Sequence, residues 1–206
     1  MRSARTARGP LAAAIAVVLG LPGMVWPAAV VGQAAPSFTL PDTHGAQRAL
    51  ADFRGKIVVL EWLNHDCPFV RKHYDSGNMQ RLQAKHTARG VVWLSIVSSA
   101  PGKQGWVSAE QANELSARKG AKATAVLLDP EGTVGRLYGA KTTPHMFVID
   151  AAGTVVYAGA IDDRPSTDPD DVAGARNHVD AALDDLTAGR PVSVATTNPY
   201  GCSVKY

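Results

Sequence analysis

Short apolar segments alternate with longer amphipathic ones along this chain, which predicts strands and helices in turn. Five segments are short, apolar and rich in β-branched residues, as is typical of buried strands: 57–63, 91–97, 124–129, 145–150 and 155–161. The turn sequence AAGT joins the last two, so we expect them to form an antiparallel hairpin.

Helical patterns occupy the intervals between these strands. They cover 68–74, 79–89, a segment that begins after Ser108, 130–138 and 175–188. Pro68 suits the first position of a helix, where its missing N–H has no partner to lose. Ser108 with Gln111 three residues later is a capping box. Strands alternating with helices, followed by a hairpin, predict an α/β three-layer sandwich with a mixed central sheet.

The first 34 residues have the features of a cleaved secretory signal peptide. Three arginines and no acidic residue precede an apolar run at 11–26, which is 16 residues long and contains Pro22. A permanent span usually needs about 20 apolar residues, so this run is too short. The small residues that follow suit cleavage after Ala29 or Ala34, and an uncleaved anchor is the alternative. We therefore expect export to the periplasm or the cell exterior, without a permanent membrane span.

A domain at 35–190 and an irregular tail at 191–206 make up the rest of the chain. The chain has 21 basic and 18 acidic residues, and removal of the three N-terminal arginines leaves 18 of each. Nucleic-acid and anionic-membrane partners select for a basic surplus on one face. The neutral balance therefore argues against both.

Cys67 is the best candidate for a reactive side chain. It comes directly after the first long strand and before Pro68, which places it at a helix N-terminus beyond the carboxyl end of a strand. Unpaired N–H groups and the helix dipole favour the thiolate there. Arg71 lies one turn later on the same face, and His65 is close in sequence. We expect a nucleophile with a lowered pKa, the alternative being a small buried residue or half of a structural disulfide.

Two segments together resemble the thioredoxin-like superfamily, in particular its redoxin and alkyl hydroperoxide reductase/thiol-specific antioxidant branch. They are IVVLEWLNHDCPF around Cys67 and KTTPHMFVIDAAGTVVYAG at 141–159. The segment APSFTLPDTHGAQRALADFRGK at 35–56 is similar to the entry segment of that branch. The resemblance covers roughly residues 34–190. It implies a thioredoxin-like fold and a thiol-based oxidoreductase without an organic cofactor.

The thioredoxin side of the resemblance assigns places to four residues. Cys67 matches the first cysteine of the C-x-x-C motif, and Val70 stands where the second would be. Ordinary dithiol exchange within that motif is therefore not expected. Thr143 and Pro144 match the threonine and cis-proline that face the active-site cysteine, so we expect a cis peptide bond and a substrate-facing role for both.

The peroxiredoxin side matches less completely. Peroxiredoxins carry Pro-x-x-x-Thr-x-x-Cys, and here Leu60 and Asn64 occupy the proline and threonine positions, although the Cys-Pro pair itself is retained. The arginine that this family carries just ahead of the matching F-I-D strand is replaced by the Thr143–Pro144 stretch. Asn64 is expected to donate a hydrogen bond to a peroxide oxygen and Arg71 to supply positive charge.

Cys202, in the tail sequence NPYGCSVKY, is expected to act as a resolving thiol. It would condense with a Cys67 sulfenic acid, within one chain or across a homodimer. A permanent structural disulfide or an idle thiol is the alternative. The predicted function is peroxide reduction through Cys67, with electrons from a reducing thiol protein.

Two alternatives to this function stay open. One is thiol-disulfide exchange without peroxidase activity. The other is a copper-binding chaperone similar to the thioredoxin-like Sco type, with His65, Cys67 and His145 as ligands. His65 is also expected to tune the Cys67 thiol.

Overall fold

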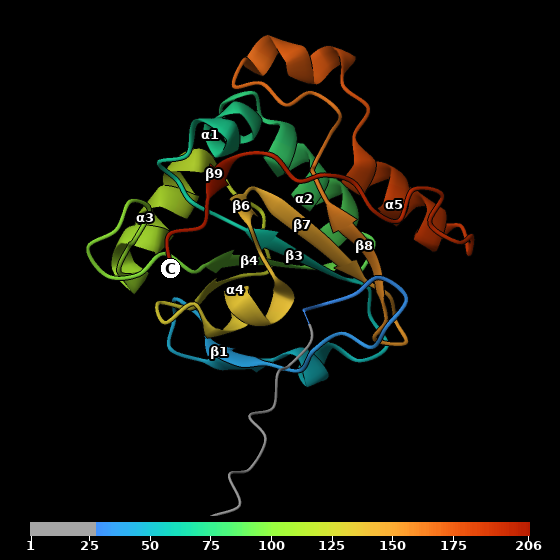
Figure 1. Cartoon of the computed structure of the whole chain (residues 1–206), viewed down its shortest axis with the longest axis horizontal. Coiled ribbons are helices and arrows are strands. Elements are labelled where there is room, and N and C mark those ends of the chain that lie inside the picture. Colours follow the sequence, from blue (N-terminus) through green and yellow to red (C-terminus); the bar gives the residue numbers. More distant parts are fainter. Residues whose placement is uncertain (1–27) are drawn as a thin grey trace, which may run out of the picture.

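A five-stranded mixed sheet organises residues 28–206, the part of the chain that the computed structural model describes (Figure 1). In spatial order its strands are β5 (Ala125–Leu128), β4 (Val92–Val97), β3 (Val58–Trp62), β7 (His145–Ile149) and β8 (Val155–Gly159). β3 is parallel to β4, and β4 to β5, whereas β7 is antiparallel to both β3 and β8. The predicted fold class, with its late hairpin, is confirmed.

Helices cover both faces of this sheet. They are α1 (Pro68–Asp75), α2 (Asn78–Thr87), α3 (Ala109–Lys119), α4 (Thr133–Tyr138) and α5 (His178–Thr187), with short 3₁₀ turns at Leu50–Phe53 and Pro169–Gly174. The predicted capping box begins α3: the Ser108 hydroxyl accepts the Gln111 N–H at 3.2 Å, and the Gln111 side chain accepts the Ser108 N–H at 2.9 Å.

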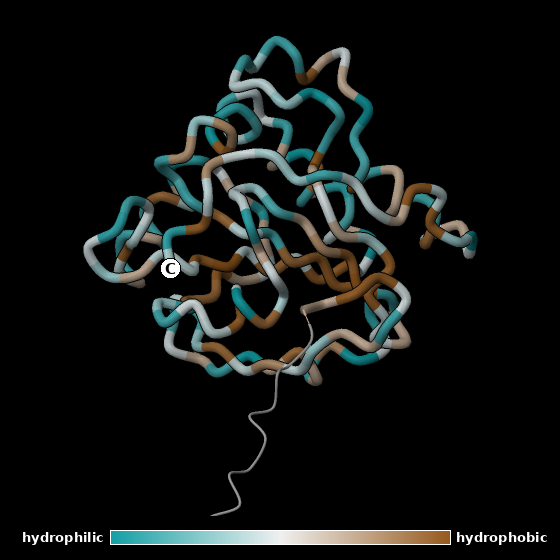
Figure 2. The backbone as a smooth tube through the Cα atoms, in the orientation of Figure 1, coloured by the Kyte–Doolittle hydropathy of each residue, from teal (hydrophilic) through white to brown (hydrophobic). Residues whose placement is uncertain are grey.

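Alternate residues of the central strands enter two separate hydrophobic cores. Along β3, Val59 faces the core covered by α1, α2 and α5, while Leu60 and Trp62 face the core covered by α4. Trp62 packs edge-on against Phe147 with ring centroids 5.3 Å apart, an arrangement aromatic pairs prefer. The apolar residues follow the strands through the middle of the molecule (Figure 2). Two-sided burial explains why the strand sequences are apolar almost throughout.

Two small two-stranded sheets flank the main one. The first pairs β1 (Thr39–Pro41) with β2 (Gln47–Ala49). The second pairs β6 (Thr142–Thr143) with β9 (Cys202–Ser203), which joins the C-terminal tail to the segment before β7. The tail is mostly irregular, as its sequence predicts. Besides this short strand, it contacts the main sheet where the Ala158 N–H of β8 donates to the Ala195 carbonyl at 3.1 Å.

Residues just ahead of position 35 contact β8. The Gly32 N–H donates to the Val155 carbonyl at 2.8 Å, and the Val155 N–H donates to the Gln33 carbonyl at 2.9 Å. Residues 32 and 33 are therefore tied to the first residue of β8. The rest of the predicted signal peptide, residues 1–27, lies outside the described residues. Among residues 28–206, none of the helices is long and apolar enough to cross a bilayer.

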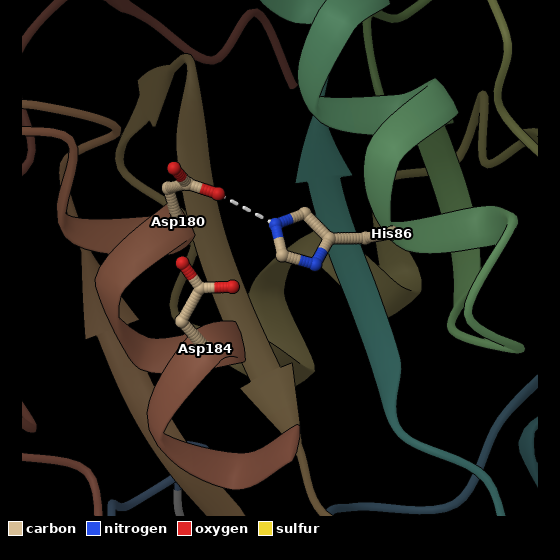
Figure 3. Close-up of side chains that lie close together, drawn as sticks. All are labelled: His86, Asp180 and Asp184. Atoms are coloured by element: carbon tan, nitrogen blue, oxygen red, sulfur yellow. Dashed lines mark hydrogen bonds and ion pairs between the residues drawn. The ribbon is translucent and has the colours of Figure 1, made fainter. Parts of the chain in front are cut away.

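A polar network connects α2 to α5 (Figure 3). Figure 3 shows the His86 ring directed at Asp180, with Nε2 and Oδ1 2.7 Å apart. Lys85 Nζ lies 2.6 Å from Asp180 and 2.9 Å from Asp184, and Arg89 also contacts Asp184 at 2.9 Å. His86, Asp180 and Asp184 are spaced like metal ligands. Because two cations already neutralise the carboxylates, the cluster is an ion-pair network joining two helices.

We expect Asp180→Asn to lower the free energy of unfolding by about 1–2 kcal/mol at pH 7. The hydrogen bond with His86 and the contact with Lys85 outweigh the opposing effect of burial and lower the pKa of Asp180 to about 2. The stabilisation is therefore present above pH 4 and is lost as the pH falls towards 2. Urea unfolding of both proteins across this range measures it. Asp184→Asn is the matched control, and an equal loss in that variant would contradict the assignment.

Candidate functional site

Cys67 occupies the position predicted for it. It is the residue immediately before α1, with Pro68 at the first helical position, and it is completely buried. A turn leads from β3 into the helix, because the Cys67 N–H donates to the Asn64 carbonyl at 3.1 Å. The Arg71 N–H in turn donates to the Cys67 carbonyl at 2.9 Å and closes the first turn of α1. The thiol thus lies beside the N-terminus of a helix, which favours its ionised form.

The Thr143–Pro144 segment faces this thiol. The peptide bond between them is cis, as predicted. The Cys67 Sγ donates a hydrogen bond to the Thr143 carbonyl at 3.0 Å. The nucleophile candidate and the proline segment therefore meet, although 76 residues separate them in sequence.

The C-terminal tail brings the second cysteine to the same place. We call residues 191–206 the strap. In the β6–β9 pair, Cys202 lies directly opposite Thr143, the residue whose carbonyl accepts the Cys67 thiol. Both thiols are free. Gly201 has a φ of +141°, and a Cβ there would lie 2.1 Å from the Thr143 carbonyl oxygen, so only glycine permits this approach.

The two thiols have opposite acidities. Burial raises the pKa of Cys67, but hydrogen bonds donated by Cys202 outweigh it, so this pKa lies below its ordinary value. Burial and the negative charge of an ionised Cys67 raise the pKa of Cys202 to about 11. Cys67 is therefore the more acidic thiol of the pair and ionises first, while Cys202 keeps its proton.

Tyr200 anchors the strap next to Cys202. Its hydroxyl donates to the buried carboxylate of Asp162 and lies 3.3 Å from the Nε2 of His73. Its ring packs edge-on against Phe69 of α1 at 5.8 Å, and the buried Lys72 ammonium lies 5.7 Å from the ring centroid. Sequence reasoning missed this group, because the tail carries no periodic pattern that relates Tyr200 to α1.

Tyr206 anchors the other end of the strap. Its hydroxyl donates to the Ala140 carbonyl at 2.8 Å, and the Arg136 guanidinium lies 4.5 Å from its ring centroid. The ring covers Gly135 in α4 so closely that a Cβ there would lie 2.5 Å from it. Cys202 is thus held between two tyrosine anchors as well as by its strand pairing.

Three other predicted residues surround Cys67 without contacting its sulfur. The Asn64 side chain accepts the Asp66 N–H at 2.9 Å and donates weakly to the Gln104 carbonyl at 3.5 Å. His65 is partly buried, and its Nε2 has no partner. The Arg71 side chain is exposed. The hydrogen bonds that lower the Cys67 pKa thus come mainly from the strap and not from these neighbours.

The predicted alternative metal site is not assembled. His145 accepts the Lys141 N–H through its Nδ1 at 3.2 Å and stacks on Phe147. Within residues 28–206, the ligand atoms of His65, Cys67 and His145 do not gather within 4.8 Å of one another. His145 is the first residue of β7 and its ring lies against Phe147 in the core covered by α4, so its proximity to Pro144 in sequence does not bring it to the thiol.

A buried carboxylate beneath α1 was also missed. Glu61 of β3 is fully buried and accepts hydrogen bonds from Tyr74, Gln83, Trp93 and Ser95, at 2.8–3.2 Å. Burial raises its pKa, and these hydrogen bonds offset part of the increase. An acidic residue in the otherwise apolar segment IVVLEWL was the available signal.

Comparison with known proteins places this site in a family. The family model described as AhpC/TSA family matches residues 31–158. The chain belongs to the AhpC/TSA family. A search of the curated proteins gave no significant match. The matched region includes Cys67 and the Thr143–Pro144 segment, whereas Cys202 and the strap lie outside it.

Solved structures agree with this assignment. An uncharacterized conserved protein from Geobacillus kaustophilus is 27% identical, with 91% of this chain and 98% of that chain covered and a TM-score of 0.72. A putative thiol:disulfide interchange protein DsbE from Chlorobium tepidum is 30% identical over 64% of this chain and 85% of its own, with a TM-score of 0.52. Peroxidoxin BcpB from Mycobacterium tuberculosis, 21% identical over 79% and 99% with a TM-score of 0.55, shares the fold. The protein is a thioredoxin-like thiol oxidoreductase.

Three histidines with little or no exposed surface predict acid sensitivity. Burial lowers the pKa of His65, His73 and His145 to about 4 each. Between pH 6.5 and 4 the unfolded chain therefore binds protons that the folded protein excludes. The free energy of unfolding should fall with pH in this window, by at most ~1.4 kcal/mol per pH unit for each histidine.

Urea unfolding from pH 7 to pH 4 measures this dependence. In His145→Gln, the slope of the free energy of unfolding against pH should decrease by the contribution of one proton. The exposed His44, changed to Gln, serves as the control. An unchanged slope in His145→Gln would show that His145 is protonated in the folded state.

Proposed function

We propose that this thiol oxidoreductase reduces peroxides, with Cys67 and Cys202 as a redox pair within one chain. The observation that carries the proposal is that Thr143 lies directly opposite Cys202 in the β6–β9 pair and accepts the Cys67 thiol through its carbonyl, so both cysteines meet at one residue. The lowered pKa of Cys67 supports its role as nucleophile, because the thiolate is the reactive form. Complete burial of Cys67 favours a small substrate over a protein.

The reaction has two steps before reduction. The Cys67 thiolate attacks one oxygen of the peroxide and breaks the O–O bond, which leaves Cys67 as a sulfenic acid and releases an alcohol or water after protonation. The Cys202 thiol then attacks the Cys67 sulfur, water leaves, and a disulfide forms. Two thiols of a reducing partner return both cysteines to the free state.

The neighbouring residues take supporting roles in this proposal. Thr143 and Pro144 shape the face that the substrate meets, and the Thr143 carbonyl orients the Cys67 thiol at 3.0 Å. Asn64 shapes the loop beside the site, because a Cβ on Gly105 would lie 2.3 Å from its amide. Arg71, exposed on the first turn of α1, supplies positive charge at the rim. The signal-peptide pattern of residues 1–34 supports export.

Thiol-disulfide exchange is the second candidate. The similarity to a putative thiol:disulfide interchange protein at 30% identity favours it, as does the absence of the peroxiredoxin threonine at position 64. Both candidates use the same pair of thiols. The first chemical step distinguishes them.

Intact mass with and without one equivalent of hydrogen peroxide tests the peroxidase reaction. We expect the reduced wild type to lose two hydrogens within minutes and Cys202→Ser to gain one oxygen on Cys67, because that variant forms the sulfenic acid but cannot resolve it. Cys67→Ser is the control and should not change. If neither the wild type nor Cys202→Ser reacts, peroxide is the wrong substrate and disulfide exchange becomes the better proposal.

Tyr200→Phe tests the importance of the strap anchor. The variant keeps the ring against Phe69 but loses the hydrogen bond to Asp162. We expect the equilibrium constant for the Cys67–Cys202 disulfide, measured in a glutathione redox buffer, to fall by roughly tenfold as the strap loosens.

Tyr138→Phe is the matched control for this change. Tyr138 is also buried and donates one hydrogen bond, to the Pro36 carbonyl, away from the strap. The Tyr138→Phe variant should have a lower melting temperature and an unchanged equilibrium constant for the Cys67–Cys202 disulfide. Equal equilibrium constants in Tyr200→Phe and the wild type would contradict the anchoring role.

A further inference from the structure

We propose that the chain binds a small zwitterion, a molecule with one ammonium and one carboxylate group, in a cavity between Arg81 and Asp170. The cavity is lined by the end of α1, the start of α2 and the segment that joins β8 to α5. A free amino acid and a short peptide are the two ligands with this chemistry. The lining includes neither Cys67 nor Cys202, so the proposal does not depend on the peroxide reaction.

One wall of the cavity is an excursion of the chain, residues 163–176, which leaves the main body between β8 and α5 (Figure 1). The excursion is closed at its base, where Asp162 and Asn177 form an antiparallel bridge. The 3₁₀ turn inside it, Pro169–Gly174, contacts α1. The cavity volume is about 680 Å³, which is within the range of small-molecule sites in proteins.

Two of the carboxylates that line the cavity are already paired with cations of the chain. The Asp75 carboxylate lies 2.5 Å from the Lys119 ammonium, and the buried Asp162 carboxylate lies 3.6 Å from the Lys72 ammonium. Neither carboxylate therefore requires a cation from a ligand. Asp162 also accepts the Tyr200 hydroxyl, so the cavity wall and the anchor of the strap share one residue.

The other two charged side chains of the lining, Arg81 and Asp170, have no ion-pair partner within residues 28–206. Both are exposed, and they come from different walls, Arg81 from α2 and Asp170 from the excursion. The Arg81 Nη1 donates to the Ser76 carbonyl at 3.0 Å, which fixes the guanidinium beside the cavity. Because the two charges do not pair with each other, one ligand that carries both signs can neutralise both.

The chemistry of these two side chains matches the two ends of a zwitterion. A guanidinium binds a carboxylate through two parallel N–H···O hydrogen bonds, and a carboxylate accepts the N–H groups of an ammonium. Val172 and Ala173 of the excursion add apolar surface for an aliphatic side chain. A ligand with charge of only one sign would leave either Arg81 or Asp170 without a partner, so it fits this cavity less well.

Isothermal titration calorimetry of the reduced wild-type protein with L-leucine and with the dipeptide leucylglycine tests the proposal. We expect saturable binding, and the tighter of the two ligands shows whether an amino acid or a peptide spans the cavity. The amide of each ligand lacks the carboxylate, and the N-acetyl form lacks the ammonium. Both analogues should bind at least about tenfold more weakly, because a hydrogen bond between charged groups is lost. Absence of saturable binding by either zwitterion, or equal affinity for the analogues, would overturn the proposal.

Two variants assign each end of the ligand to its partner. Arg81→Gln should weaken binding of the zwitterion about tenfold and leave binding of the amide unchanged, because the amide has no carboxylate. Asp170→Asn should weaken binding of the zwitterion similarly and leave binding of the N-acetyl form unchanged. Arg118→Gln and Glu110→Gln, exposed on α3 and outside the cavity, are the matched controls and should bind like the wild type. Circular dichroism melting checks that every variant is folded. Wild-type affinity in Arg81→Gln and Asp170→Asn would show that the ligand does not occupy this cavity.

Discussion

The pairing of β9 with β6 is the contact on which the site depends. It places Cys202 opposite Thr143, whose carbonyl also receives the Cys67 thiol, so three segments far apart in sequence meet at one point. Gly201 permits the approach, and Tyr200 and Tyr206 fix the strap on either side. Without this pairing, Cys67 would lie at the start of a helix with no thiol beside it.

The same contact gives two chemically identical side chains different properties. Cys67 combines a helix N-terminus with hydrogen bonds from Cys202, and these lower its pKa against the effect of burial. Burial and the charge of an ionised Cys67 raise the pKa of Cys202, which therefore keeps its proton. One geometry thus defines both a nucleophile and its partner, and it leaves the partner closer to solvent.

The family resemblance and the strap supply different parts of the site. The region that matches the AhpC/TSA family contains Cys67 and the Thr143–Pro144 segment. Val70 stands where thioredoxins carry their second cysteine, and it is buried in the core. The second thiol comes instead from a C-terminal segment beyond the matched region. The chemistry that Cys67 can perform therefore depends on the strap, whose contacts the family match does not cover.

The sequence by itself determined the local features of this protein. Apolar segments specified the five strands, and the chemistry of Pro68 and of Ser108 with Gln111 specified where α1 and α3 begin. Only the tertiary structure decided that Cys202 meets Cys67 and that His145 is directed away from it. Strand periodicity and helix caps depend on near neighbours, whereas these contacts join segments 76 to 135 residues apart. Their formation depends on which buried polar groups find partners, such as Tyr200 with Asp162, and no local pattern contains that information.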